Sequence, residues 1–253
     1  MQKLACYKSH FSLGKSINTL DKSSGSIENY PVSIIDLVLH SKQDHLCLVE
    51  DNVSSFLEAI ARCTENKLKL IFGLRISITK DIKNQNGDSL KNRAKYIIFA
   101  KSNKGYQALI KLWSVAAKEG FYYNACLDFE NLHRLWSEDL SLAIPFYDSF
   151  LHLNSFEGHF HVPEFGAIKP IMLLEDNGIP FDGLLRKKAI DYSKNNKLET
   201  LEAQSIYYKS KLDFIAYNTF RCISERTNIE KPEFNHLCSD SFNYDRWLIE
   251  NNK

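Results

Sequence analysis

The sequence predicts an α/β fold in which short strands alternate with amphipathic helices around a mainly parallel sheet. Apolar runs of strand length occur at 46–49, 96–100 and 140–146. Segments with the 3.6-residue periodicity of amphipathic helices follow the first two of these runs. The 253 residues are sufficient for one substantial core, as a large single domain or as two small ones, and we expect a single domain over 1–253.

The first half of the chain supplies one predicted βα unit and a further strand. Residues 46–49 read as a short buried strand, and 52–63 as a helix with Phe56, Ile60 and Cys63 on one face. The segment 68–78 alternates around Gly73 and predicts another strand. A polar turn or hairpin tip is expected at 81–92 because it contains Asn-Gly-Asp.

The second half continues the alternation. The run at 96–100 predicts a strand, and 106–117 predicts a helix with one apolar stripe. A strand at 140–146 and helices at 184–195 and 210–225 follow. The stretch 154–170 is irregular, and no interpretation is favoured there. Chemistry in such folds is expected at the C-terminal ends of the strands.

Composition and charge exclude several classes of protein. Lys plus Arg is 32 against 31 for Asp plus Glu, so no global basic field indicates direct binding of nucleic acid. The six cysteines have no paired spacing, which predicts buried reduced thiols rather than a zinc site or disulfides. No signal peptide is recognisable and no apolar run approaches about 18 residues, so we expect a cytoplasmic protein without a membrane span.

Two short motifs carry candidate chemistry. Gly14-Lys15-Ser16 resembles the end of a phosphate-binding loop, but its earlier glycine position holds Ser9, and an ordinary turn is favoured. His159-Phe160-His161, with His152 nearby, is half of a metal site at best. A pair of surface loop histidines is the favoured interpretation.

The run from Gly105 to Leu132 has the sequence G-Y-Q-A-L-I-K-L-W-S-V-A-A-K-E-G-F-Y-Y-N-A-C-L-D-F-E-N-L. It closely resembles the segment G-Y-x-N-L-x-x-L-x-S-x-A-x-x-E-G-F-Y-Y-x-P-R-I-D-x-E-x-L of the PHP domain found at the N-terminus of bacterial DNA polymerase III alpha subunits. Residues 5–16, 48–58, 67–75 and 95–102 resemble further motifs of that family in the same order. The resemblance implies the family's distorted (β/α)7 TIM-like barrel.

The resemblance also places nine residues on the family's metal-ligand positions: Cys6, Lys8, Val49, Glu50, Arg75, Lys95, Tyr147, Ser205 and Tyr207. Of these, we count only Cys6 and Glu50 as retaining a metal-coordinating side chain. Lys8, Arg75 and Lys95 are fixed cations, which oppose a divalent cluster directly. We therefore regard the nine as vestigial pocket positions, and expect no metal ligands, no cofactor and no catalytic residues.

Two interpretations of the three cations remain open. In the favoured one they replace the metals in an internal network, with Glu50 among the counter-charges, because unpaired buried charge is costly. In the other they form an exposed anion pocket that holds a phosphate.

By resemblance, the chain is expected to be a degenerate, non-catalytic PHP domain with a structural or docking role in DNA replication. It is expected to be either a domain excised from a larger polymerase or a stand-alone piece from a split or phage-like gene. The implied partners are the polymerase body, in cis or in trans, and a proofreading exonuclease, with DNA contacted only indirectly. The alternative is a metal-dependent phosphoesterase or 3′–5′ exonuclease with an unconventional site such as His152, His159 and His161.

Overall fold

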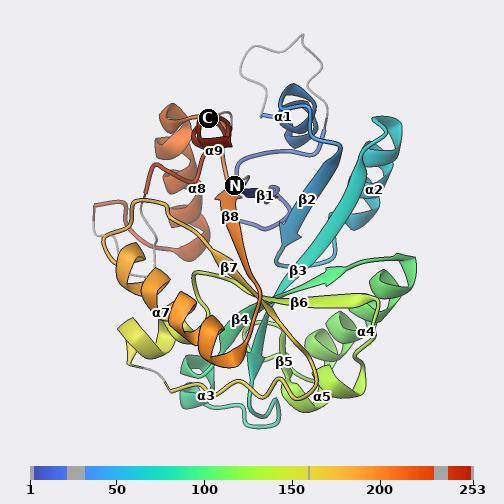
Figure 1. Cartoon of the computed structure of the whole chain (residues 1–253), viewed down its shortest axis with the longest axis vertical. Helices are drawn as coiled ribbons and strands as arrows, with labels where there is room; N and C mark the ends of the chain where they lie inside the picture. Colours follow the sequence, from blue (N-terminus) through green and yellow to red (C-terminus); the bar gives the residue numbers. More distant parts are fainter. Residues whose placement is uncertain (1–2, 22–31, 159, 231–238, 252–253) are drawn as a thin grey trace.

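A computed structural model describes residues 3–21, 32–158, 160–230 and 239–251, and shows seven strands closed into a barrel (Figure 1). The barrel strands are β1 (Leu4–Tyr7), β2 (His45–Glu50), β3 (Lys69–Thr79), β4 (Ala94–Ala100), β6 (Leu140–Ile144), β7 (Ile171–Leu174) and β8 (Thr200–Ile206). Their order is β2-β1-β8-β7-β6-β4-β3, and the β2–β3 pairing closes the ring. The predicted α/β class and TIM-like barrel are confirmed.

One strand runs against the others. Strand β4 is antiparallel to both β3 and β6, whereas the remaining barrel pairs are parallel. The start of β4 therefore lies at the rim where the parallel strands end, and Lys95 is in register with Ser77 of β3. The short strand β5 (Cys126–Asp128) extends the sheet by pairing with the end of β3.

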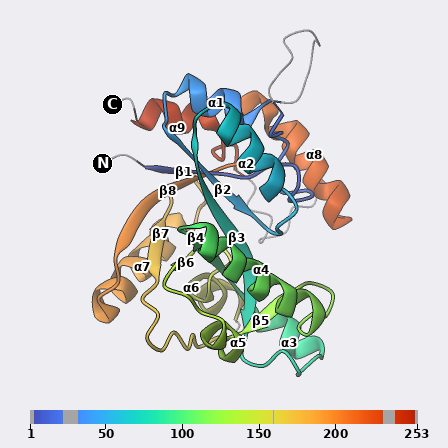
Figure 2. The same ribbon diagram turned by 90° about the vertical axis from the view of Figure 1, so that its right-hand side faces the viewer.

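Helices surround the barrel on the outside (Figures 1 and 2). The longer ones are α1 (Ile34–His40), α2 (Phe56–Glu65), α4 (Asn103–Lys118), α5 (Phe129–Arg134), α7 (Asp182–Asn196), α8 (Phe214–Glu225) and α9 (Tyr244–Asn251). The short ones are α3 (Gly87–Lys91), α6 (Phe150–His152), the π-helical turn Leu153–Glu157 and the 3-10 turn Lys211–Asp213. No described helix is long and apolar enough to cross a membrane.

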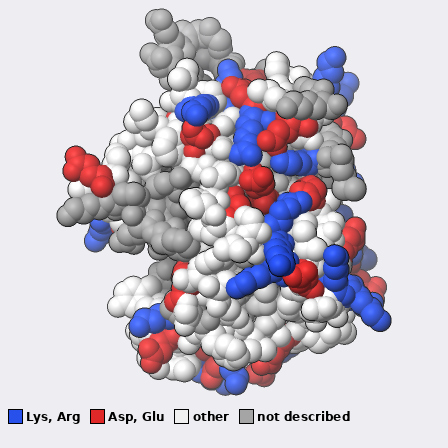
Figure 3. Space-filling model, turned by 60° about the vertical axis from the view of Figure 1, so that its left-hand side comes forward, with Lys and Arg blue, Asp and Glu red and all other residues white. Residues whose placement is uncertain are grey.

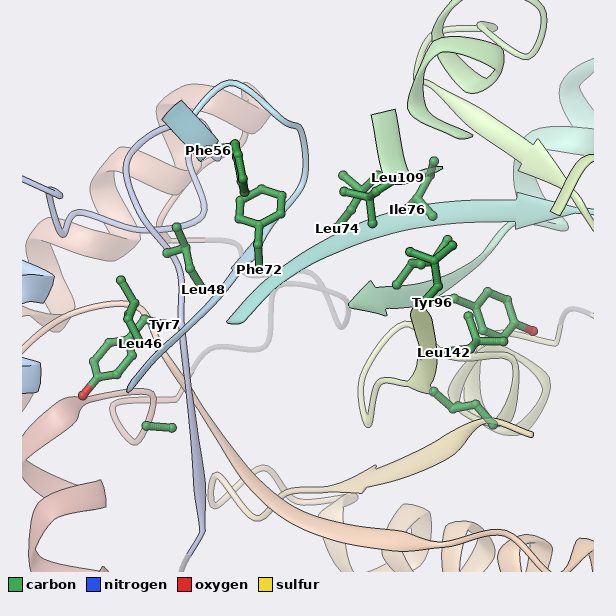
Figure 4. Packing of buried hydrophobic residues seen from close by; sticks show 14 of the residues in the cluster. Tyr7, Leu46, Leu48, Phe56, Phe72, Leu74, Ile76, Tyr96, Leu109 and Leu142 are labelled. Atoms are coloured by element: carbon green, nitrogen blue, oxygen red, sulfur yellow. The ribbon is translucent and has the colours of Figure 1, made fainter. Parts of the chain in front are cut away.

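Apolar side chains fill both faces of the barrel wall. One cluster contains small or branched residues from several strands, including Cys6, Val49, Ala143 and Leu173. A larger cluster packs strand residues against the helices, and Figure 4 shows part of it around Leu48 and neighbouring side chains. Strands buried on both faces are expected to have nearly continuous apolar sequence. This explains why 46–49 and 96–100 were recognisable as strands.

Several predicted boundaries differ from the structure: helix α4 begins at Asn103 rather than Tyr106, and helix α8 begins at Phe214 rather than Ser210. Helix α2 begins at Phe56 rather than at Asn52, because the Asn52 side chain accepts from the Ser54 amide and donates to the Phe11 carbonyl, which makes a turn. The polar segment 81–92 contains the short helix α3, which a capping box between Asn86 and Ser89 starts.

Two glycines explain part of the Gly105–Leu132 segment. A Cβ on Gly105 would lie 2.2 Å from the carbonyl oxygen of Asp139, and a Cβ on Gly120 would lie 1.9 Å from that of Cys126. These glycines let helix α4 and the turn after it approach neighbouring backbone closely. The segment therefore contributes packing at these positions.

Candidate functional site

A polar pocket of ≈ 380 Å³ lies at the rim where the parallel strands end. Its charged lining comes from several elements, with five cations and three carboxylates: Lys8, Lys15, Arg75, Lys95, Arg221, Asp51, Asp148 and Glu225. Lys8 follows β1 directly, Asp51 follows β2, and Lys95 lies near the start of the antiparallel β4. The barrel topology thus gathers residues from distant parts of the sequence. Figure 3 shows acidic and basic side chains interspersed over one face of the molecule.

Three of the cations have a direct carboxylate partner. The ammonium of Lys8 lies 3.0 Å from an Asp51 oxygen, and the Lys8 side chain is only 3% exposed. The guanidinium of Arg75 lies 2.7 Å from an Asp148 oxygen and also donates to the Tyr147 carbonyl at 3.2 Å. Lys15 pairs with Glu225 at the outer edge of the pocket. Each pair uses one cation and one carboxylate.

Lys95 differs from these three. Over the described residues its ammonium makes no ion pair and no hydrogen bond, although it lines the pocket. Burial lowers the pKa of Lys95, and the positive charges of Arg75 and Lys8 lower it further, against the attraction of Asp51 and Asp148. Lys95 therefore lines the pocket without a direct carboxylate partner among the described residues.

Asp148 connects several of these groups. Its backbone is left-handed, with φ at +57°. Its amide donates to Nδ1 of His152 at 3.0 Å, and its carbonyl accepts from the Lys95 amide at 2.8 Å. Burial opposes ionisation of the carboxyl, but the positive charges of Arg75 and of the other nearby cationic groups together outweigh this and lower its pKa. The contact with Arg75 makes Asp148 part of the charge network of the rim.

Glu50 is held by serines. Its carboxylate accepts from the Ser9 amide at 3.0 Å and from the hydroxyls of Ser9 and Ser12. Burial raises its pKa, although Lys8 and these hydrogen bonds act in the opposite direction. Glu50 was expected among the counter-charges of the cations, and it does act on Lys8 over a longer range. The direct partner of Lys8, however, is the next residue, Asp51.

A second, smaller cavity of ≈ 20 Å³ lies within the barrel end, large enough for about one water molecule. Seven of the nine vestigial positions line it: Cys6, Lys8, Val49, Arg75, Tyr147, Ser205 and Tyr207. Lys95 lines the larger pocket, which shares Lys8, Arg75 and Tyr207 with the smaller one. The structure thus brings eight of the nine aligned residues to these two cavities, and Glu50 lines neither of them.

Glu175 is a buried carboxyl of this cavity that sequence reasoning did not single out. It follows β7 directly, and its oxygens accept from the Ser205 amide and hydroxyl at 2.9 Å and from Asn177 at 2.9 Å. Burial raises its pKa against these hydrogen bonds. The signal that could have found it is its place at the end of an apolar run, Ile171–Leu174.

The histidines of the alternative site belong to different surroundings. His152 is fully buried and stacks on Phe181, whereas His161 is buried beside Tyr96, whose hydroxyl lies 3.2 Å from its Nε2. His161 is therefore not the surface histidine that was expected. His159 lies outside the described residues. Among the described residues, His152 has ring contacts with Tyr147, Phe156 and Phe181, whereas His161 has ring contacts with Tyr96, Phe129 and Phe150.

The donor set at the rim does not fit the divalent metals that the family resemblance implies. Val49 offers no donor atom, and Lys8, Arg75 and Lys95 place positive charge where a cation would bind. Within the described ranges, no group of three or more His, Cys, Asp or Glu side chains is arranged to hold a metal ion.

Comparisons with known proteins agree on one family. The sequence profile of the PHP domain matches residues 9–161. The chain is 27% identical to the DNA polymerase III subunit alpha of Aquifex aeolicus over 154 residues, which cover 57% of this chain and 13% of that protein. It is 23% identical to the same subunit of Borreliella burgdorferi over 235 residues, 85% of this chain and 20% of that protein. An 88-residue match to the Mycoplasma genitalium subunit, at 27% identity, covers 35% of this chain and 9% of that protein.

The chain thus spans about a fifth or less of the length of these relatives. The profile match covers more than half of the chain, and it includes β2, β3, β4, β6 and the segment from Gly105 to Leu132. With the closed seven-stranded barrel, this match establishes that the chain belongs to the PHP domain family.

Proposed function

We propose that this chain is a non-catalytic PHP barrel of a DNA polymerase III alpha-type protein, with a structural and docking role in DNA replication. The polymerase body, in cis or in trans, is its proposed main partner, and a proofreading exonuclease is a second candidate. The support for this replication role is the similarity to three DNA polymerase III alpha subunits. We also propose that residues 1–253 act as a single domain.

The non-catalytic part of the proposal rests on two partly buried ion pairs at the rim. Lys8 with Asp51 and Arg75 with Asp148 place side-chain cations at positions aligned with metal ligands. A PHP phosphoesterase would need metal-bound water as its nucleophile, and these cations repel the metal that generates it. They supply positive charge but no hydroxide.

The first prediction concerns metal content and hydrolysis. We expect no stoichiometric zinc, manganese or iron on the purified chain, measured by elemental analysis. We also expect no turnover of p-nitrophenyl phosphate or labelled single-stranded DNA with Mn²⁺ or Zn²⁺ beyond that in EDTA. The physical reason is the direct repulsion between a divalent ion and the three cations.

A His161→Ala variant serves as the control in the same assay. Metal-dependent turnover that this change abolishes would support the phosphoesterase alternative and contradict our proposal. Turnover of equal size in both proteins that follows the chain through gel filtration would also contradict our proposal, whereas turnover that separates from the chain belongs to a contaminating enzyme.

The docking role requires a separate measurement. We expect the chain to co-sediment with the polymerase body from the same organism in analytical ultracentrifugation. Independent sedimentation of the two at micromolar concentrations would contradict the docking proposal and leave the metal prediction standing.

A further inference from the structure

We infer that the rim pocket binds a phosphate group directly, without a metal ion, and that Lys95 is its principal contact. The inference rests on the proposed function, because it requires that cations have replaced the metals. It names the ligand class for a site whose side chains have lost the family's metal chemistry. The ligand is a phosphate monoester or inorganic phosphate.

The first argument is the charge balance of the pocket lining. Lys8, Lys15 and Arg75 are each matched by one carboxylate. Lys95 has no direct counter-ion among the described residues, so its positive charge is available to a ligand. A lysine ammonium binds phosphate as a point charge with three donors.

The buried carboxyls below the pocket do not serve Lys95 as partners. Glu50 accepts its hydrogen bonds from Ser9 and Ser12, and Glu175 accepts from Ser205 and Asn177. The charges that act on Lys95 over longer range are instead Asp51 and Asp148, and each of these already pairs with another cation. An anion beside Lys95 would complete the local charge balance.

The second argument is the size and polarity of the space. The pocket volume of ≈ 380 Å³ lies within the range of about 300–1,000 Å³ that is usual for small-molecule sites. It admits a phosphate group with a small organic substituent. The rings of Tyr207 and Tyr217, which stack on each other with centroids 5.7 Å apart, also line it. They offer an apolar surface to that substituent.

The test is equilibrium dialysis of the whole chain with radiolabelled inorganic phosphate, in EDTA and at constant ionic strength. We expect saturable binding to the wild-type chain. Lys95→Gln should weaken it by about tenfold or more, since it removes a charge-assisted contact. Lys95→Arg should restore most of the affinity because it keeps the charge.

Lys101→Gln is the matched control. Lys101 is an exposed lysine just beyond the other end of β4, outside the rim pocket, and this change should leave binding unaltered. Line broadening of the phosphate ³¹P resonance by the wild-type chain gives a readout that needs no variant, should Lys95→Gln fail to fold. Absence of saturable binding in EDTA, or binding that Lys95→Gln leaves unchanged, would overturn the inference.

Two further measurements complete the test. One identifies the molecule that carries the phosphate group, and the other distinguishes failure of this inference from failure of the proposed function. Tighter binding of deoxyadenosine monophosphate than of inorganic phosphate would identify a nucleotide as the ligand, and equal affinities would identify free phosphate. Equal affinity for deoxyadenosine without phosphate would contradict the inference. Binding that appears only when Mn²⁺ or Zn²⁺ is added would contradict the metal-free function as well, whereas no binding under either condition would overturn this inference alone.

Discussion

Asp148 shows how one residue organises the rim. Its left-handed backbone, at φ +57°, is a conformation that Asp and Asn tolerate better than most residues. That conformation belongs to a turn in which the carboxylate reaches Arg75 while the amide reaches His152. The local strain and the ion pair therefore occur at the same residue.

Asp148→Asn should destabilise the fold by about 2–3 kcal/mol at pH 7, between the values for exposed and fully buried ion pairs. The Arg75 side chain is 13% exposed and that of Asp148 33%, which places the pair between those limits. Asparagine keeps the left-handed conformation, so the change tests charge alone. Urea unfolding of Asp148→Asn, of Arg75→Met and of the double variant measures the coupling free energy between the two side chains. Additive effects of the two changes would contradict a direct interaction.

The pH dependence of this stabilisation follows from the lowered pKa of Asp148. The pKa of Asp148 is lowered in the folded state, so its stabilisation is complete above the unfolded carboxyl pKa of about 3.9. It is lost as pH falls through the lower, folded pKa. The difference in melting temperature between wild type and Asp148→Asn should be constant from pH 7 to pH 5 and shrink below about pH 4. A difference that shrinks between pH 7 and pH 5 would indicate another titrating group.

The charged residues of the site were only half predictable. Lys8, Arg75 and Lys95 were found because they interrupt motif positions in the sequence. Their partners were not, because Asp51 and Asp148 become neighbours of these cations only when β1, β2, β3 and β6 come together in one ring. Sequence spacing does not contain that geometry.

At the scale of elements, the strands that escaped prediction are short or polar. Strand β1 has four residues, and β8 carries Glu202 and Gln204 among its apolar positions. Glu202 pairs with Arg186 of α7, and Gln204 donates to the Ser241 carbonyl, so tertiary contacts satisfy these polar groups. Without those partners in view, the run 200–206 does not resemble a buried strand. By contrast, an apolar run such as 96–100 predicts a buried strand from its sequence alone.

The helix α4 gives a test of close packing at its first turn. Gly105→Ala should destabilise the chain by about 1–3 kcal/mol, because the new Cβ would lie 2.2 Å from the Asp139 carbonyl oxygen. The better helix propensity of alanine offsets less than about 1 kcal/mol of this. Urea unfolding monitored by circular dichroism measures the effect.

Gly183→Ala is the matched control, because Gly183 lies in the first turn of α7 and a Cβ there meets no atom within 4 Å. This change should stabilise the chain by about 0.4–1 kcal/mol. Equal effects of the two substitutions would show that helix propensity, rather than contact with Asp139, decides the outcome at Gly105.

At the scale of the whole molecule, the β1–β2 pairing is the weakest part of the closed barrel because it has the fewest registered residue pairs. Strand β1 lies between β2 and β8, with four registered pairs to β8 but one to β2. The residue before it is held by the C-terminal helix α9: the Lys3 amide donates to Asn251 at 2.6 Å, and the Trp247 indole donates to the Lys3 carbonyl at 2.9 Å. Figures 1 and 2 show α9 beside β1. The sequence predicted a barrel through its family resemblance, but neither β1 nor α9 was foreseen.

Trp247→Ala should therefore loosen the ring at β1. Trp247 is 2% exposed and packs beside Tyr244, so the truncation should cost about 3–5 kcal/mol of unfolding free energy. Trp247→Phe keeps most of the apolar contact and loses the hydrogen bond to Lys3, and should cost less. Hydrogen–deuterium exchange distinguishes local from global effects. In Trp247→Ala, we expect amide exchange to accelerate by a larger factor in β1 than in β6, because β6 is not adjacent to β1 in the ring order. Equal acceleration of exchange in β1 and β6 would show that α9 stabilises the whole fold rather than β1 in particular.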